Sequence, residues 1–246
     1  MTIEARIGVR NGLARGPNPW QYDDTEDKRL VRLKIEIENL KKAILALSAV
    51  VEESVRKAVT ATEERDSALA QEVIDNDTTI DALEVELEEE CLKVLALHQP
   101  VAIDLRFIIA VLKINSFLER IGDQAVNIAE RASYLAEHKD VEMPAAVPQL
   151  TEKVQAMLRK SLDALVNMDA ERASEVLSLD DEVDAIHRRM YKKVQRMMCE
   201  QPDKLEGLVQ WLSVSRCLER IADQAENIAE DVLYMIEGQI VRHQKD

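Results

Sequence analysis

Apolar residues recur along the first part of the chain at alternating intervals of three and four positions. The seam that they form runs through Leu30, Leu33, Ile37, Leu40, Ile44, Leu47 and Val51. This heptad spacing places apolar side chains along one side of an α-helix, where they pack against neighbouring helices. The pattern therefore predicts a long helix that belongs to a helical bundle.

The same periodicity predicts five further helices. They cover approximately residues 73–94, 100–135, 150–168, 176–194 and 203–237. Proline disfavours helix at the residue before it and suits a first helical turn, so the Gln-Pro pairs at 99–100 and 201–202 are predicted to lie between helices. Two prolines within residues 138–148 mark a longer break between the third and fourth helices.

A thirteen-residue segment is written twice, about 100 residues apart. Residues 118–130 read LERIGDQAVNIAE and residues 218–230 read LERIADQAENIAE, and only two positions differ. Such a period indicates a repeated structural unit. We therefore predict an all-α fold of two tandem, structurally similar three-helix bundles, at residues 28–138 and 145–237, preceded by a flexible N-terminal arm at residues 1–27.

Composition narrows the functional classes. The chain has 246 residues, 46% of them hydrophobic, and a formal net charge of −15. A strongly acidic chain is not attracted to nucleic acid or to anionic lipid by its overall field. No apolar run is long enough to span a membrane. The three cysteines, Cys91, Cys199 and Cys217, form no close-spaced pair, which is typical of reduced thiols in a cytosolic protein.

Four pairs of acidic residues share the spacing acid-x-x-x-Asp. They are Asp77 with Asp81, Glu119 with Asp123, Asp180 with Asp184, and Glu219 with Asp223. Residues four apart lie on the same face of a helix. In each predicted hairpin the two pairs are numbered symmetrically about the Gln-Pro turn, so they lie at the same height on neighbouring helices, roughly 30 Å from the turn at 1.5 Å per residue.

Facing carboxylates repel one another, by on the order of 4 kcal/mol for two charges 4 Å apart at an effective dielectric constant near 20. Oxygen ligands suit hard cations such as Mg²⁺, Ca²⁺, Mn²⁺ and ferric iron. The acid pairs therefore predict a shallow metal site between two helices in each unit. Arg120 and Arg220 are an alternative source of compensating charge, and a solvated acidic surface is the simplest alternative.

The repeated segments, together with QPVAIDLR at residues 99–106, resemble the PhoU family, the accessory proteins of the high-affinity phosphate transport system. The resemblance covers about residues 28–237. It implies two similar three-helix bundles that bind metal ions, with iron, manganese, magnesium or zinc as the expected metals. The implied ligands are Asp77, Asp81, Glu119, Asp123, Asp180, Asp184, Glu219 and Asp223.

The resemblance also implies a function without enzymatic activity. Members of this family are cytoplasmic negative regulators of phosphate uptake. They link the ATPase subunit of a phosphate transporter to a sensor histidine kinase and hold the phosphate-starvation response off when phosphate is plentiful. They commonly self-associate, so a homodimer is expected. The second unit departs from the first after its Gln-Pro pair, where Asp-Lys-Leu-Glu replaces Val-Ala-Ile-Asp-Leu-Arg.

Two other classes of protein remain open from the residues alone. A carboxylate-bridged di-iron enzyme uses a Glu-x-x-His motif from each of two helices. This chain offers one imperfect match, Asp184 followed by His187, whose counterpart in the first unit is Glu84. The other class is a helical scaffold that binds no metal and whose acids only keep it soluble.

Overall fold

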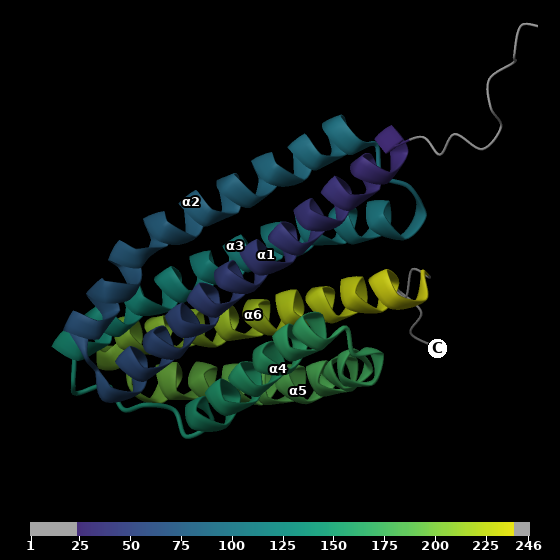
Figure 1. The fold of residues 1–246 in the computed structure, drawn as a ribbon. Coiled ribbons are helices and arrows are strands. Elements are labelled where there is room, and N and C mark those ends of the chain that lie inside the picture. The colour runs from purple at the N-terminus through teal and green to yellow at the C-terminus, as the bar shows by residue number, and fades with distance from the viewer. Residues whose placement is uncertain (1–23, 239–246) are drawn as a thin grey trace, which may run out of the picture.

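The computed structural model describes residues 24–238 as six α-helices joined by short connections (Figure 1). Its elements are α1 (Asp24–Glu64), α2 (Ser67–His98), α3 (Ala102–Glu137), α4 (Val147–Asn167), α5 (Ala170–Glu200), the short 3-10 helix η1 (Pro202–Lys204) and α6 (Leu205–Glu237). Within residues 24–238 there is no strand. Helices α1–α3 form one bundle and α4–α6 a second beside it, which confirms the predicted fold class.

The turns that open α2 and α5 are built alike. Arg65 and Met168 both adopt the left-handed conformation, with φ of 55° and 50°. The next residue in each turn, Asp66 or Asp169, is an N-cap whose carboxylate accepts hydrogen bonds from amides in the first turn of the helix. Those amides have no partner within the helix, so each cap stabilises its helix by about 1 kcal/mol. The two aspartates thus mark equivalent starting points for α2 and α5.

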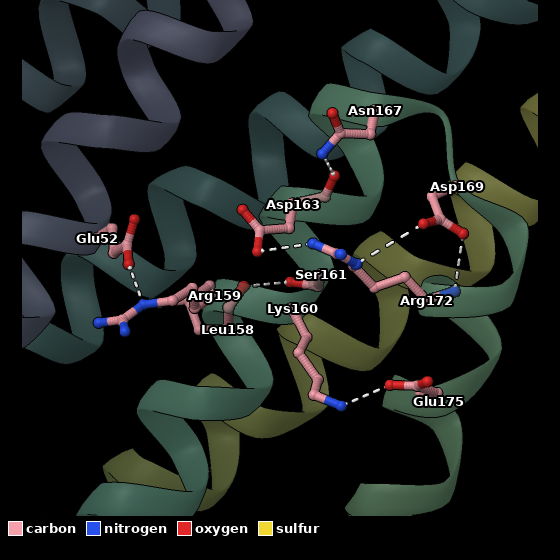
Figure 2. A network of polar contacts seen from close by, with 10 residues as sticks. All are labelled: Glu52, Leu158, Arg159, Lys160, Ser161, Asp163, Asn167, Asp169, Arg172 and Glu175. Atoms are coloured by element: carbon pink, nitrogen blue, oxygen red, sulfur yellow. Dashed lines mark hydrogen bonds and ion pairs between the residues drawn. The ribbon is translucent and has the colours of Figure 1, made fainter.

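Polar contacts surround the second of these turns (Figure 2). Arg172 of α5 reaches back to Asp163 of α4 at 3.0 Å, and Arg159 of α4 donates to Glu52 of α1 at 3.1 Å. Exposed ion pairs contribute little stability individually. They do show how the helices are placed: the first contact gives the register of α4 against α5, and the second shows that α4 lies beside α1.

The first helix of each unit differs in length. Helix α1 has 41 residues, whereas α4 has 21. Helix α1 begins at Asp24, ahead of residue 28, where the sequence predicts the first bundle to start, and residues 1–23 of the predicted arm lie outside the described residues. The third helix begins at Ala102 rather than at Pro100, because Gln99 is left-handed and Val101 is extended.

The two bundles pack on each other mainly through α3 and α6, the most extensive helix contact in the described residues. Lys113 of α3 pairs with Asp231 of α6 at 3.1 Å, and Tyr134 of α3 donates to Glu206 of α6 at 3.2 Å. Between these two links the repeated segments 118–130 and 218–230 run antiparallel to each other. Their alanines are fully buried and allow the helices to approach closely.

The connection between the bundles is held by a clamp that Arg65 forms and by the packing of Val141 on Gly207. The Arg65 guanidinium donates to the backbone carbonyls of Leu135, His138 and Val141. The Val141 side chain is 3% exposed and packs on Gly207, where an added Cβ would overlap a Val141 methyl group. Glycine is required at that close approach. The turn of the first bundle, the linker and α6 are therefore fastened together.

Candidate functional site

The predicted acidic cluster of the first unit forms between α2 and α3. Partial burial raises the pKa of Asp77, and the nearby charges of Asp81 and Asp123 raise it further. The pKa of Asp123 is raised by burial and then by Asp81, and that of Glu119 by burial, by Asp123 and, more weakly, by Asp81. The carboxylates of one helix therefore lie close enough to those of the other for their charges to interact across the hairpin.

The second unit repeats this arrangement in a more enclosed form. Asp180 is 8% exposed. Burial raises the pKa of Asp223 to about 6, and the charges of Glu219, Asp180 and Asp184 add to the effect while Arg220 opposes it. An ionised carboxylate is disfavoured where solvent is excluded and like charges are near. The surroundings of Asp223 therefore disfavour its ionised form.

Each cluster is bordered by a polar pair that joins its two helices. In the first unit the Asn115 amide donates to the backbone oxygen of Glu84 at 2.9 Å and to its side-chain Oε1 at 3.3 Å. In the second unit His187 Nδ1 lies 2.8 Å from the Ser215 hydroxyl. Counted from the Asp caps and along the repeated segments, His187 is equivalent to Glu84 and Ser215 to Asn115.

Asn115 and Ser215 are not among the residues that the sequence singles out, and the sequence points to His187 and its counterpart Glu84 only through the di-iron alternative. The pKa of Glu84 is raised by burial, then by Glu88 and by Asp81, which places Glu84 at the edge of the first cluster. The signal was present in the sequence, since Glu84 lies three residues after Asp81 on a helix. His187 Nδ1 forms a hydrogen bond with the Ser215 hydroxyl, so the histidine of the Asp-x-x-His motif lies in the contact between α5 and α6.

Gly122, in the first repeated segment, lies where α3 approaches α2 closely. A Cβ at Gly122 would lie 3.1 Å from the Ile80 side chain on α2. The equivalent positions of the second unit are Ala222 and Val183, one methyl group larger on one helix and one methylene smaller on the other. The total volume of each pair is conserved, as close packing requires. This exchange accounts for one of the two differences between the repeated segments.

Within residues 24–238, no three histidine, cysteine or carboxylate side chains are arranged so as to hold one metal ion. Asn127 and Asn227 continue the acidic stripe in the sequence, but each donates to a backbone carbonyl of its own helix at 2.7 Å. The side-chain oxygens of Gln124 and Gln224, next to Asp123 and Asp223, are buried and accept no hydrogen bond from the described part of the chain. Each cluster is thus rich in side-chain oxygens, and the carboxylates within it repel one another.

Two helical units of this kind, each with an acidic hairpin, define a class of protein that the comparisons identify. The family model described as "PhoU domain" matches twice, at residues 44–132 and 147–232. The first match begins inside α1, at the point from which the rest of α1 is as long as the whole of α4. The second match begins at the first residue of α4. The fold is that of tandem PhoU domains.

Curated relatives and solved structures agree with this match. The chain is 39% identical over 211 residues to a "Phosphate-specific transport system accessory protein PhoU homolog" of Pseudomonas putida, covering 85% of this chain and 82% of that one. It is 38% identical to the homolog of Aquifex aeolicus, over 87% and 97%. The crystal structure of PhoU from Pseudomonas aeruginosa matches with a TM-score of 0.80 and 37% identity, over 84% and 99%. The protein belongs to the PhoU family.

Proposed function

We propose that the protein is a cytoplasmic, non-enzymatic negative regulator of phosphate uptake. In this role it links the ATPase subunit of a phosphate transporter to a sensor histidine kinase and keeps the starvation response off in rich phosphate. The observation that carries the proposal is the similarity over 85% of the chain to relatives named as accessory proteins of phosphate-specific transport. No helix within residues 24–238 is long and apolar enough to cross a membrane.

The test is deletion of the gene in its own host. A reporter of phosphate-starvation genes should then be active in rich phosphate, and the wild-type gene supplied on a plasmid should restore repression. Normal repression in the deletion strain would contradict the proposed role. Co-purification of the ATPase subunit and the kinase with a tagged chain tests the link itself, and a strain that represses normally without either contact excludes it.

We also infer that both acidic clusters bind metal ions, with iron, manganese, magnesium or zinc as candidates. The donor chemistry supports this, since every ligand in the clusters is a carboxylate oxygen, and hard cations prefer such ligands. The raised pKa values of Asp77, Glu119, Asp123 and Asp223 support it too, because they reflect carboxylates that are partly buried and, secondly, close to like charges. The carboxylates of residues 24–238 are not arranged around one ion, so a cation would have to draw them together. Once bound, it would tie α2 to α3 and α5 to α6 and so stabilise each hairpin.

Thermal melts with and without Mn²⁺ or iron test the metal proposal. A ligand at a hundred times its dissociation constant adds about 2.7 kcal/mol to the stability of the folded state. Asp123→Asn should reduce the shift produced at the first cluster and leave the second cluster responsive, and Asp223→Asn should do the reverse. If metal shifts wild type and both variants equally, the clusters are not the binding sites.

Self-association is the remaining part of the proposal. We expect a homodimer, as the family resemblance implies. Light scattering coupled to size exclusion should give twice the mass of the chain at micromolar concentration. A single-chain mass across the concentration range, with metal present, would exclude the dimer.

A further inference from the structure

The middle helices of the two units carry opposite charge at equivalent positions. Equivalent positions are found by counting from the N-caps Asp66 and Asp169. On this count, residues 86, 89 and 90 of α2 correspond to residues 189, 192 and 193 of α5. All three positions are glutamate in α2, whereas α5 has Arg189, Lys192 and Lys193. The buried positions of α2 are all apolar in α5 as well, so this inversion lies on the surface; in α2 they are Ala70, Val73, Ile80, Leu87, Cys91 and Val94. In a chain of net charge −15, residues 185–199 contain no Asp or Glu.

We call the cations Arg188, Arg189, Lys192, Lys193 and Arg196 the basic face of α5. All five are exposed, and at about 100° per residue they lie within one outward arc of the helix. Arg188 has one contact, with Asp184 of its own helix at 3.4 Å. For the other four the structure gives no ion pair within residues 24–238. The basic face therefore presents its charge to solvent.

The basic face begins where the neighbouring helix stops. The ion pairs Lys153–Glu182 and Lys160–Glu175 set the register of α4 against α5. Continued to the first residue of α4, this register places Val147 level with Arg188. The last turns of α5 thus extend beyond α4, whereas the equivalent turns of α2 are flanked by the additional length of α1. The unequal first helices leave this end of α5 uncovered.

The acidic surface of α2 lies far from the basic face. Helices α2 and α5 do not contact each other and occupy opposite sides of the molecule (Figure 1). The intervening helices separate them by three interhelical spacings of 8–10 Å, which is roughly 25–30 Å. The Debye length at physiological ionic strength is about 8 Å. An anionic surface that touches α5 is therefore attracted by the basic face and largely screened from the acids of α2.

We propose that the basic face of α5 docks the protein onto an anionic phospholipid bilayer. A convex helix with five outward cations suits a flat, extended array of lipid phosphates. Tyr191, 44% exposed, lies beside the cations and is the type of side chain that occupies a membrane interface. The choice of a bilayer over other polyanions rests on the proposed function, since a phosphate transporter is embedded in a membrane. Acidic α2 then faces away from the lipid.

Co-sedimentation of the full chain with vesicles tests this proposal without transporter or kinase. Vesicles of phosphatidylcholine with 30% phosphatidylglycerol should bind the protein, pure phosphatidylcholine should not, and binding should weaken steeply with added salt. One cation near such a surface contributes about 1 kcal/mol, or roughly fivefold in affinity. Lys192→Gln with Lys193→Gln should therefore weaken binding about 30-fold, while the two lysine-to-arginine changes should retain it.

The matched control is Arg32→Gln with Lys34→Gln, which removes the same charge from exposed positions of α1. It should bind anionic vesicles like wild type. Absence of wild-type binding, or an equal loss in this control, overturns the proposal. Tighter binding to single-stranded DNA than to the vesicles would overturn the choice of a bilayer. Because the assay contains only protein and lipid, its failure is distinct from failure of the regulatory role, which the deletion strain reports.

Discussion

Asp223 provides the sharpest test of the electrostatic account of the acidic clusters. Its pKa rises from 3.8 to about 6 through burial and the charges of Glu219, Asp180 and Asp184. For a fully buried group such a difference disfavours the ionised form by roughly 3 kcal/mol. Asp223 is partly exposed, so solvent screening reduces this to about 1–2 kcal/mol. We therefore expect Asp223→Asn to stabilise the metal-free protein at pH 7.5 by about that amount.

The pH dependence has a definite sign. The folded pKa of Asp223 lies above the unfolded value, so between about pH 4 and pH 6 the folded state binds more protons than the unfolded state. The contribution of this group to stability is fully present only below the unfolded pKa of about 4 and is lost as the pH rises through 6. Metal-free wild type should gain about 1 kcal/mol relative to Asp223→Asn between pH 7.5 and pH 5.

Urea unfolding at pH 5, 6 and 7.5 in the presence of a chelator measures both effects, with stability taken from linear extrapolation. Comparison with Asp223→Asn cancels the titration of every other group. Saturating metal should reverse the order, because the variant then lacks a ligand. Parallel stability profiles for wild type and Asp223→Asn, in chelator and in metal alike, would refute the reasoning.

Three further substitutions test how the bundles are joined, each read by urea unfolding. Asp231→Asn removes the charge from a carboxylate that is 2% exposed and pairs with Lys113, and should cost about 1–3 kcal/mol, less in a Lys113→Met background. Gly207→Ala should cost about 1–3 kcal/mol through overlap with Val141, and Val141→Ala should recover part of it; no recovery would contradict the steric cause. Arg65→Ala removes the guanidinium donor from the carbonyls of Leu135, His138 and Val141 and should cost about 2–3 kcal/mol. A loss below about 0.5 kcal/mol would show that water replaces the guanidinium.

Much of the fold could be predicted because helical periodicity and a repeated segment are local signals. The heptad seam identified α1, and the symmetric numbering about the Gln-Pro turns placed Asp77 and Asp81 level with Glu119 and Asp123. Height along a hairpin depends only on the rise per residue, so it survives small errors in helix ends.

The contacts between the units could not be predicted in the same way. Periodicity shows which face of a helix is apolar, but α3 and α6 each bury two faces, and the pattern does not say which partner covers which. The Arg65 clamp joins residues 70 to 76 positions apart through backbone carbonyls, which carry no sequence signal. The pairs Glu84–Asn115 and His187–Ser215 share a position but no residue type, so a search for repeated motifs passes over them.

The first hairpin packs Gly122 against Ile80, and the second has Ala222 and Val183 at the same two positions. One hairpin could therefore replace the other only if both of its helices were transferred together. Grafting the α6 segment alone onto α3 would crowd Ile80, and the converse graft would leave a void beside Val183. A chain that swaps α2–α3 with α5–α6 as intact hairpins keeps both volumes. Each helix pair thus behaves as one packed module. A larger side chain on one helix of a hairpin is accommodated when the facing side chain on the other helix becomes smaller.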